Sequence, residues 1–220
     1  MNNIFHIAID GPVASGKGTI ARGLSEKLGI PCLDTGAFYR GIAVYLRDRK
    51  IAPEDKKSVT DALQGLKMGI EIKNGITHVK INGEDVTNKL RDNDISQIAS
   101  TIAIIPEVRK FAIAKQQEIA ETKSFILEGR DIASVVLPHA KYKFYLTSKL
   151  KTRGLRRQAD LATKGIEITI AEMKKQIKTR DRRDTKKGGL KLVKEAIVID
   201  NTRLTVKETI DEFISHISGS

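Results

Sequence analysis

Residues 11–19 read Gly11-Pro12-Val13-Ala14-Ser15-Gly16-Lys17-Gly18-Thr19. Residues 4–9 before them form an apolar run that predicts a buried strand, and residues 17–28 after them predict a helix. Glycines in such a loop let successive backbone N–H groups point at one anion, and the helix N-terminus adds partial positive charge at the same place. Lys17 adds a cation that reaches outer phosphates. The stretch therefore predicts a phosphate-binding loop rather than a plain glycine-rich turn.

The residue after the lysine departs from the general phosphate-loop pattern. It is Gly18, whereas the pattern has Ser or Thr, whose hydroxyl ligates Mg²⁺. Thr19 carries the nearest hydroxyl. The Gly-Lys-Gly-Thr form resembles the nucleoside monophosphate kinases more than the GTPases or motor ATPases. We therefore expect Mg²⁺ to be held mostly by phosphates and water, as this ion often is.

Length and composition indicate a packed α/β protein. The chain has 220 residues, of which 40% are hydrophobic, and these values suit one large domain with insertions. Its single cysteine, Cys32, excludes an internal disulfide and is expected to be a small core residue. The sequence has no apolar run as long as a membrane span and no pattern typical of a signal peptide. We expect a reducing, cytoplasmic setting and no membrane partner.

The net charge of +12 is concentrated in one segment. Residues 149–194 hold 16 Lys and Arg against 5 Asp and Glu, and they include no aromatic residue that could stack on a base. Such a segment suits a cover over polyphosphates at least as well as a nucleic-acid surface, so we expect no nucleic-acid partner. A basic RNA-binding protein remains an alternative, and it predicts salt-dependent RNA binding without ATP turnover.

The rest of the chain alternates between strand and helix patterns. Strands are predicted at residues 4–9, 31–33, 124–127, 142–146 and 196–199. Helices are predicted at residues 17–28, 37–49, 106–121 and 206–217. Short apolar strands separated by helices are typical of a parallel sheet covered on both faces. The fold class is therefore α/β, with a five-stranded parallel sheet.

Two regions interrupt this alternation. Residues 67–86 alternate in strand fashion around Asn74-Gly75 and Asn82-Gly83, which predicts a small antiparallel meander. Residues 149–187 are helical and basic with a turn near Lys164-Gly165, which predicts a helical lid of two helices. The expected domains are a core of residues 1–65, 101–148 and 188–220, an insertion of residues 66–100 that binds the acceptor nucleotide, and a lid of residues 149–187.

Polar residues follow the predicted strands, where parallel sheets bind ligands. Glu128 follows the third strand and resembles the second acidic element of phosphate-loop enzymes, which orders Mg²⁺ through water. Arg130 beside Asp131 is suited to a bidentate phosphate contact, although a structural ion pair is the alternative. In a helix, Arg180, Asp184 and Lys187 would share one face, either as a binding surface or as a solvated one.

Four ordered motifs together resemble the bacterial cytidylate kinases. They are residues 11–19, Leu33-Asp34-Thr35-Gly36-Ala37-Phe38-Tyr39-Arg40, Gly129-Arg130-Asp131 and Arg180-Asp181-Arg182-Arg183-Asp184. The meander at residues 67–86 and the stretch from Ile98 to Arg109 match the same family. The resemblance covers most of the chain. It implies a three-layer fold of the P-loop NTPase type and transfer of the γ-phosphoryl group of ATP, with Mg²⁺, to CMP or dCMP.

The resemblance also implies roles for individual residues. ATP would be bound by the residues of the loop, namely Gly11, Pro12, Val13, Ala14, Ser15, Gly16, Lys17, Gly18 and Thr19. Thr35 would lie near the cytosine or ribose, Ser100, Arg109 and Asp131 would read the base, and Asp184 would bind the ribose. Arg40, Arg130 and Arg180 would hold the acceptor phosphate. Lys187 stands where family members usually have arginine, and Gly188-Gly189 also departs from the family sequence.

The chemistry of phosphoryl transfer indicates roles for the basic residues near the expected phosphates. Transfer between phosphates requires positioning and positive charge rather than a general base. The catalytic set is therefore Lys17, Arg130 and Arg180, with Arg153 and Arg157 closing over ATP from the lid and excluding water. A kinase for another small acceptor is the main alternative, because it would share the loop but not the Gly-Arg-Asp and Arg-Asp-x-x-Asp elements. We expect a monomer whose ligands are nucleotides.

Overall fold

The computed structural model describes residues 4–73, 76–92, 94–163, 165–186 and 189–218. The chain divides into two compact units. The first comprises Met1–Ile4 and Pro31–Phe125, and the second comprises Phe5–Ile30 and Ile126–Ser220. The predicted insertion, residues 66–100, falls within the first unit. The predicted phosphate loop and lid both fall within the second.

The main sheet has five strands in the order β2-β6-β1-β7-β8. They are β1 (His6–Asp10), β2 (Cys32–Asp34), β6 (Phe125–Gly129), β7 (Tyr142–Thr147) and β8 (Ile197–Asp200). Strand β7 pairs in parallel with β1 and with β8. Ile7, Ala8 and Ile9 are fully buried, as expected for an inner strand of a parallel sheet covered on both faces. The α/β fold class predicted from the sequence is confirmed.

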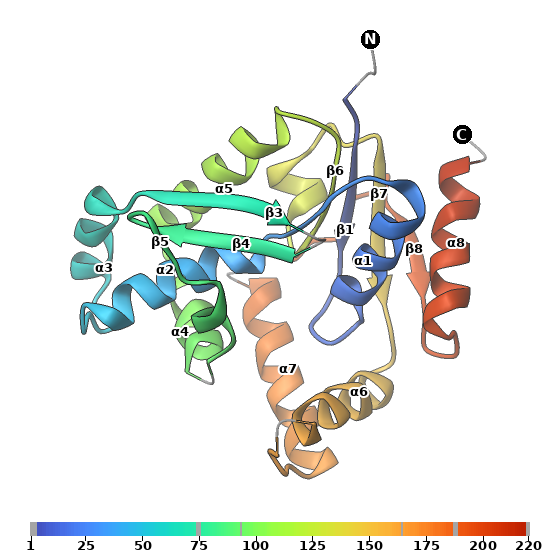
Figure 1. Cartoon of the computed structure of the whole chain (residues 1–220). Coiled ribbons are helices and arrows are strands. Elements are labelled where there is room, and N and C mark those ends of the chain that lie inside the picture. The colour runs from blue at the N-terminus through green and yellow to red at the C-terminus, as the bar shows by residue number, and fades with distance from the viewer. Residues whose placement is uncertain (1–3, 74–75, 93, 164, 187–188, 219–220) are drawn as a thin grey trace. The chain divides into compact units, whose positions relative to one another are not determined.

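The second unit contains four α-helices and one π-helical turn among its described residues. They are α1 (Lys17–Leu28), η3 (Ile132–Val136), α6 (Leu150–Ala162), α7 (Ile170–Lys186) and α8 (Val206–Ser218). Figure 1 shows α1 and α8 side by side on one face of the sheet. They cross closely at Gly23, where an added Cβ would lie 2.3 Å from Cδ1 of Ile210.

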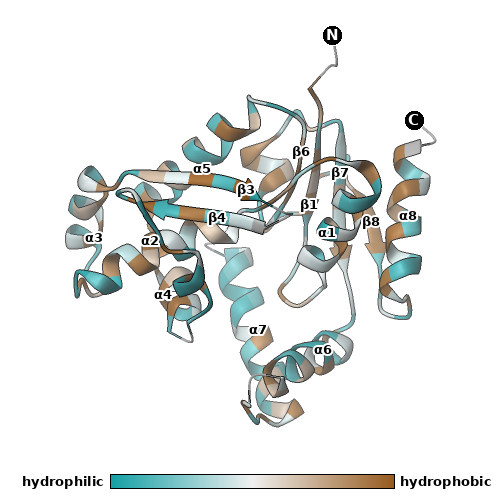
Figure 2. Ribbon diagram, in the orientation of Figure 1, coloured by the Kyte–Doolittle hydropathy of each residue, from teal (hydrophilic) through white to brown (hydrophobic). Residues whose placement is uncertain are grey.

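The two helices predicted within residues 149–187 are present as α6 and α7. Helix α7 is largely hydrophilic, in contrast with the strands of the main sheet (Figure 2), and buries Met173 and Ile177. Gly154 of α6 faces Cδ1 of Ile170, so the two helices pack closely. The turn between them includes Gly165 with a φ of +71°. Lys164, the other residue of the predicted turn, lies outside the described residues.

The first unit combines helices with a small antiparallel sheet. Its helices are α2 (Gly36–Asp48), α3 (Lys56–Ala62), α4 (Ile95–Ile102) and α5 (Pro106–Ala120), with 3₁₀ turns η1 (Leu63–Gly65) and η2 (Thr87–Arg91). Its strands are β3 (Met68–Lys73), β4 (Ile76–Ile81) and β5 (Glu84–Asp85), in the order β3-β4-β5. The predicted antiparallel meander is therefore confirmed.

The Asn-Gly signal identified the β4–β5 turn for a physical reason. Asn82 and Gly83 have φ values of +51° and +91°, the left-handed conformations that a two-residue type I′ turn requires. The Asn82 side chain accepts a hydrogen bond from the N–H of Lys67 at 2.8 Å, which ties the turn to the start of β3. The other predicted turn, Asn74-Gly75, lies outside the described residues.

Strand and helix boundaries agree with the sequence prediction to within two residues for most elements. Helix α1 begins and ends where the pattern predicts, at Lys17 and Leu28. Helix α5 opens with Pro106 in its first turn, as expected. Within the described residues, no helix is both long and apolar enough to cross a membrane.

Candidate functional site

The phosphate loop joins β1 to α1 within the second unit. Gly11 has a φ of +152°, and a Cβ there would lie 2.1 Å from the carbonyl oxygen of Leu146 in β7, so only glycine fits. Gly16, the N-cap of α1, has a φ of +96°. Ala14 between them also has a positive φ, +59°, which is uncommon for a residue with a side chain. The strand–loop–helix arrangement predicted from the sequence is present.

Lys17 is the first residue of α1, and its side chain is buried. Its Nζ donates hydrogen bonds of 2.9 Å to the carbonyl oxygens of Gly11 and Pro12. Burial, and next the charge of Arg130, lower the pKa of Lys17 to about 7, while Glu128 and Asp10 act in the opposite direction. The loop therefore holds a cation that any bound anion would stabilise.

Asp10, the last residue of β1, organises the turn that follows β6. Its carboxylate accepts hydrogen bonds from the N–H groups of Ile132 at 2.9 Å and Ala133 at 2.8 Å. Burial raises the pKa of Asp10 to about 6, against these two hydrogen bonds, which lower it. Asp10 therefore fixes the backbone directly after Arg130 and Asp131. The sequence places it at a strand end but gives no sign of this contact, which spans more than 120 residues.

Glu128 lies against the start of α1. A Cβ added to Gly18 would be 3.5 Å from Oε1 of Glu128, so this carboxylate faces the position where other phosphate loops carry a hydroxyl. Thr19 is exposed, and its Oγ1 accepts a hydrogen bond from Arg22 at 3.5 Å. No group of three or more His, Cys, Asp or Glu that could hold a metal occurs among the described residues. One carboxylate beside bound phosphates suits Mg²⁺, which keeps several waters.

The predicted acceptor-phosphate residues of this unit lie near Lys17. Arg130 donates through Nε to Oδ2 of Asp184 on α7 at 2.6 Å, and the two side chains are only 21% and 15% exposed. The positive charge of Arg180, also on α7, contributes to the lowered pKa of Lys17. The structure therefore brings Arg130, Asp184 and Arg180 toward the phosphate loop. Lys187 lies outside the described residues.

The three arginines of α6 make different contacts. Arg153 donates to the carbonyl oxygen of Val13 at 3.0 Å and to Asp181 at 2.7 Å. Arg156 donates to both oxygens of Asn201, at 2.9 Å each, and Asn201 Nδ2 donates to the carbonyl oxygen of Ser15 at 3.1 Å. Arg157 is half-buried, and among the described residues its side chain makes no hydrogen bond or ion pair.

Sequence reasoning did not select Arg156, Asn201 or Asp181. Asn201 directly follows β8, so extending the search for polar residues to the end of the last strand would have found it. Arg156 lies three residues after Arg153 on one face of α6, which gives a second, weaker signal. Asp181 stands within the Arg-Asp-Arg-Arg-Asp motif, but nothing local distinguishes it from Asp184.

The first unit holds the other predicted acceptor residues on helices that pack together. Thr35 is buried at the N-cap of α2, and Arg40 on the same helix forms a 2.6 Å ion pair with Asp34. Ser100 lies on α4 and Arg109 on α5, and both helices pack against α2. Within this unit the fold therefore gathers these four residues on three neighbouring helices.

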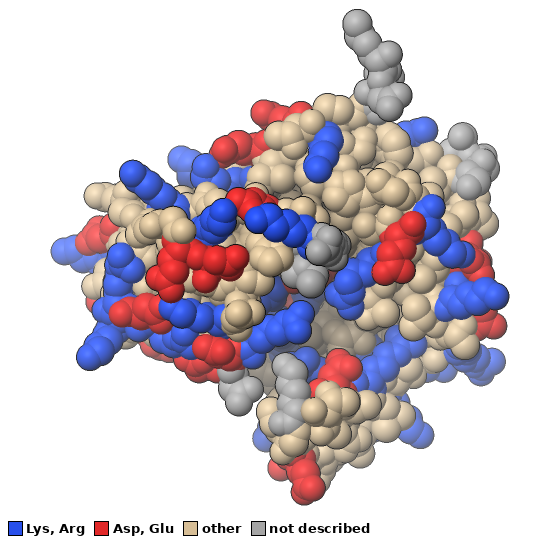
Figure 3. Space-filling model, viewed as in Figure 1, with Lys and Arg blue, Asp and Glu red and all other residues tan. Residues whose placement is uncertain are grey.

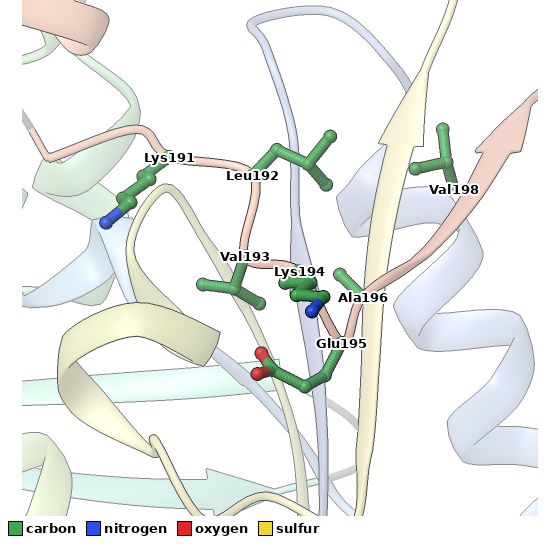
Figure 4. Close-up of a pocket in the computed structure, with 7 residues that line it drawn as sticks. All are labelled: Lys191, Leu192, Val193, Lys194, Glu195, Ala196 and Val198. Carbon is green, nitrogen blue, oxygen red and sulfur yellow. The ribbon is translucent and has the colours of Figure 1, made fainter.

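A surface groove lies in a different part of the second unit from the phosphate loop. The groove is lined by residues from the segment that leads into β8, namely Lys191, Leu192, Val193, Lys194, Glu195, Ala196 and Val198 (Figure 4). It includes none of the phosphate-loop residues. Figure 3 shows Lys and Arg interspersed with Asp and Glu over the visible face.

Comparison with known proteins identifies the family. A family model described as cytidylate kinase matches residues 7–219. The chain belongs to the cytidylate kinase family. A cytidylate kinase from Thermotoga petrophila is 41% identical over 213 residues, which cover 96% of this chain and 95% of the relative. One from Onion yellows phytoplasma is 38% identical over 216 residues, covering 97% and 95%.

Solved structures of low sequence identity share the fold of this chain. A shikimate kinase from Bacteroides thetaiotaomicron aligns over 98% of this chain and 99% of its own, with a TM-score of 0.51 and 11% identity. Identity this low supports only a shared fold. The cytidylate kinase resemblance expected from four sequence motifs is thus confirmed at the family level.

The lowered pKa of Lys17 predicts how nucleotide binding depends on pH. At pH 8 a lysine of pKa about 7 is mostly neutral, and a bound polyphosphate raises its pKa again. Binding of a non-hydrolysable ATP analogue should therefore take up about 0.9 proton at pH 8 and about 0.1 at pH 6. Calorimetry in buffers of different ionisation enthalpy measures this uptake. Equal uptake by Lys17→Ala at pH 8 would contradict the assignment to Lys17.

Proposed function

We propose that this protein transfers the γ-phosphoryl group of ATP to CMP or dCMP, giving ADP and CDP or dCDP. The observation that carries the proposal is the convergence of Lys17, Arg130 and Arg180 at the phosphate loop, where the charges of the two arginines help to lower the pKa of Lys17. Three cations at one loop suit a reaction between two phosphate groups, whose charges must be brought together. Family membership supplies the nucleotide class.

The donor is held by the loop and α1. In the proposed complex, the backbone N–H groups of residues 14–19 and the N-terminus of α1 bind the phosphates of ATP. Lys17 leaves the carbonyl oxygens of Gly11 and Pro12, to which it donates at 2.9 Å, and neutralises the outer phosphates. Arg157, half-buried on α6, contributes positive charge from the lid.

A divalent metal would be held beside Glu128. Its carboxylate lies against Gly18, and we propose that it binds Mg²⁺ through water while the phosphates supply the direct ligands. Mg²⁺ held there would offset the negative charge of the phosphate groups. Gly18 lacks the hydroxyl of the general pattern, so the protein contribution to metal binding rests on this one carboxylate.

The family resemblance supplies the residues that we propose for the acceptor nucleotide. We assign its phosphate to Arg40, Arg130 and Arg180, its ribose to Asp184 and its base to Ser100, Arg109 and Asp131, with Thr35 near the sugar. Arg130 and Asp184 form an ion pair of 2.6 Å, and this proximity supports assigning them to neighbouring groups of one acceptor. No general base is required, because the attacking group is a phosphate oxygen that is already ionised.

The proposal has a direct test. The full-length protein is assayed for conversion of ATP to ADP with CMP, dCMP, UMP and AMP as acceptors, in the presence of Mg²⁺. We expect turnover with the two cytidine nucleotides and very little with the other two. Acceptor-independent ATP hydrolysis, or no turnover with any of the four, would contradict the proposal.

ATP and CMP are cytoplasmic metabolites, so we expect a cytoplasmic enzyme, which we propose acts as a monomer.

A further inference from the structure

The backbone of Val13 in the phosphate loop is held on both sides of its Cα by helices α6 and α7. Its N–H donates to Oδ1 of Asp181 on α7 at 3.1 Å, and its carbonyl oxygen accepts from NH1 of Arg153 on α6 at 3.0 Å. Arg153 and Asp181 are joined to each other at 2.7 Å. Backbone donor, carboxylate, guanidinium and backbone acceptor thus form a closed ring of hydrogen bonds.

This ring is shielded from solvent. The side chains of Arg153 and Asp181 are 10% and 21% exposed. Arg153 also donates through Nε to the carbonyl oxygen of Ser148 at 3.0 Å, which fixes the plane of its guanidinium at the end of β7. Charge-assisted hydrogen bonds with so little exposure are stronger than those of a surface pair, and the loss of one partner leaves the other unsatisfied.

A second anchor holds the loop two residues further on. The carbonyl oxygen of Ser15 accepts a hydrogen bond from Nδ2 of Asn201 at 3.1 Å. Arg156 of α6 in turn donates two hydrogen bonds of 2.9 Å to Asn201. Arg153 and Arg156 are three residues apart and share one face of α6. The same helix face therefore anchors the loop on both sides of Ala14, whose φ of +59° requires support from its surroundings.

We propose that Arg153 and Asp181 are positioning residues that hold the phosphate loop in the shape that receives ATP. In this assignment Arg153, predicted from the sequence to contact ATP itself, acts through the loop. The competing arrangement has the Asp181 carboxylate standing in for a phosphate and leaving when ATP binds. The ion pair favours positioning, because Arg153 neutralises Asp181 and also donates to the backbone carbonyls of Val13 and Ser148. The identity of the nucleotide rests on the proposed function.

The test uses Asp181→Ala and Asp181→Asn in the full-length chain. Hydrogen–deuterium exchange of the peptide covering residues 11–19 is measured without nucleotide, and KM for ATP, KM for CMP and kcat are measured separately. Asp181→Ala removes the acceptor of the Val13 N–H, so exchange in this peptide and KM for ATP should each rise about tenfold. KM for CMP should stay within about twofold. Asp181→Asn keeps one acceptor oxygen. Its exchange rate and its KM for ATP should therefore lie between those of Asp181→Ala and those of the native protein.

A matched control is available on the same helix. Arg182 is exposed and lies next to Asp181, so Arg182→Ala should leave exchange and both KM values unchanged. Unchanged exchange and KM for ATP in both Asp181 variants would overturn the proposal, and tighter ATP binding by Asp181→Ala would establish the competing arrangement. The exchange measurement needs no substrate, so it decides the positioning role even if the native protein fails to phosphorylate CMP.

Discussion

Lys17→Ala is expected to lower kcat for CMP phosphorylation by about 100- to 1,000-fold, which is the usual cost of removing one group that stabilises a transition state electrostatically. Lys17 is buried at the start of α1, and its Nζ is held 2.9 Å from two loop carbonyls. Residues 11–19 contain no other lysine that could replace it. A coupled assay of ADP formation with saturating ATP and CMP measures the effect.

Stability should respond differently from activity in this variant. Burial lowers the pKa of Lys17 from its ordinary value to about 7, so the folded state disfavours the charged amine. This penalty is fully present below pH 7 and is relieved as the pH rises from about 7 toward 10.5. Lys17→Ala should therefore unfold at a temperature equal to or above that of the native protein at pH 7. A large fall in that temperature would show that lost activity reflects unfolding.

Lys27→Ala is the matched control for Lys17→Ala. Lys27 lies on the last turn of α1 and is about half exposed, and it pairs with Asp211 at 2.6 Å. Exposed ion pairs contribute little to stability. Turnover by Lys27→Ala should match that of the native protein. If Lys17→Ala kept more than a tenth of native turnover, Lys17 would not be the main phosphate-binding cation.

The second large effect concerns the choice of base. We expect kcat/KM for CMP to exceed that for UMP by about 10³, because cytosine offers an amine donor where uracil has a carbonyl acceptor. Asp131, 7% exposed at the turn after β6, is the proposed acceptor for that amine. Asp131→Asn should lower kcat/KM for CMP about 100-fold and leave UMP nearly unchanged. Initial rates with both nucleotides measure the ratio.

The local frame around Asp131 makes this variant informative. Its backbone carbonyl accepts hydrogen bonds from Val135 and Val136, and Asp10 accepts from the next two N–H groups, and Asp131→Asn leaves all four of these hydrogen bonds in place. Asp211→Asn on the exposed face of α8 is the control and should keep the native ratio. Equal losses for CMP and UMP in Asp131→Asn would mean that this side chain does not read the base.

The sequence by itself determined those features of the structure that depend only on residues close together in the chain. Gly11 and Gly16 supply positive φ values between an apolar strand and an amphipathic helix, so the phosphate loop is encoded within about 25 residues. Asn82-Gly83 encodes its turn in two residues, and Pro106 marks the start of α5 for the same local reason. The ordered motifs also sufficed to place the chain in its family.

Only the tertiary structure decided what holds the loop. The contacts of Asp10 with Ile132 and Ala133, of Asp181 with Val13 and of Asn201 with Ser15 join residues more than 120 positions apart. No local propensity encodes such partners, since they depend on the strand order β2-β6-β1-β7-β8, which brings the ends of β1, β6, β7 and β8 to one edge of the sheet. The lowered pKa of Lys17 has the same origin, because burial and neighbouring charges exist only after the chain has folded.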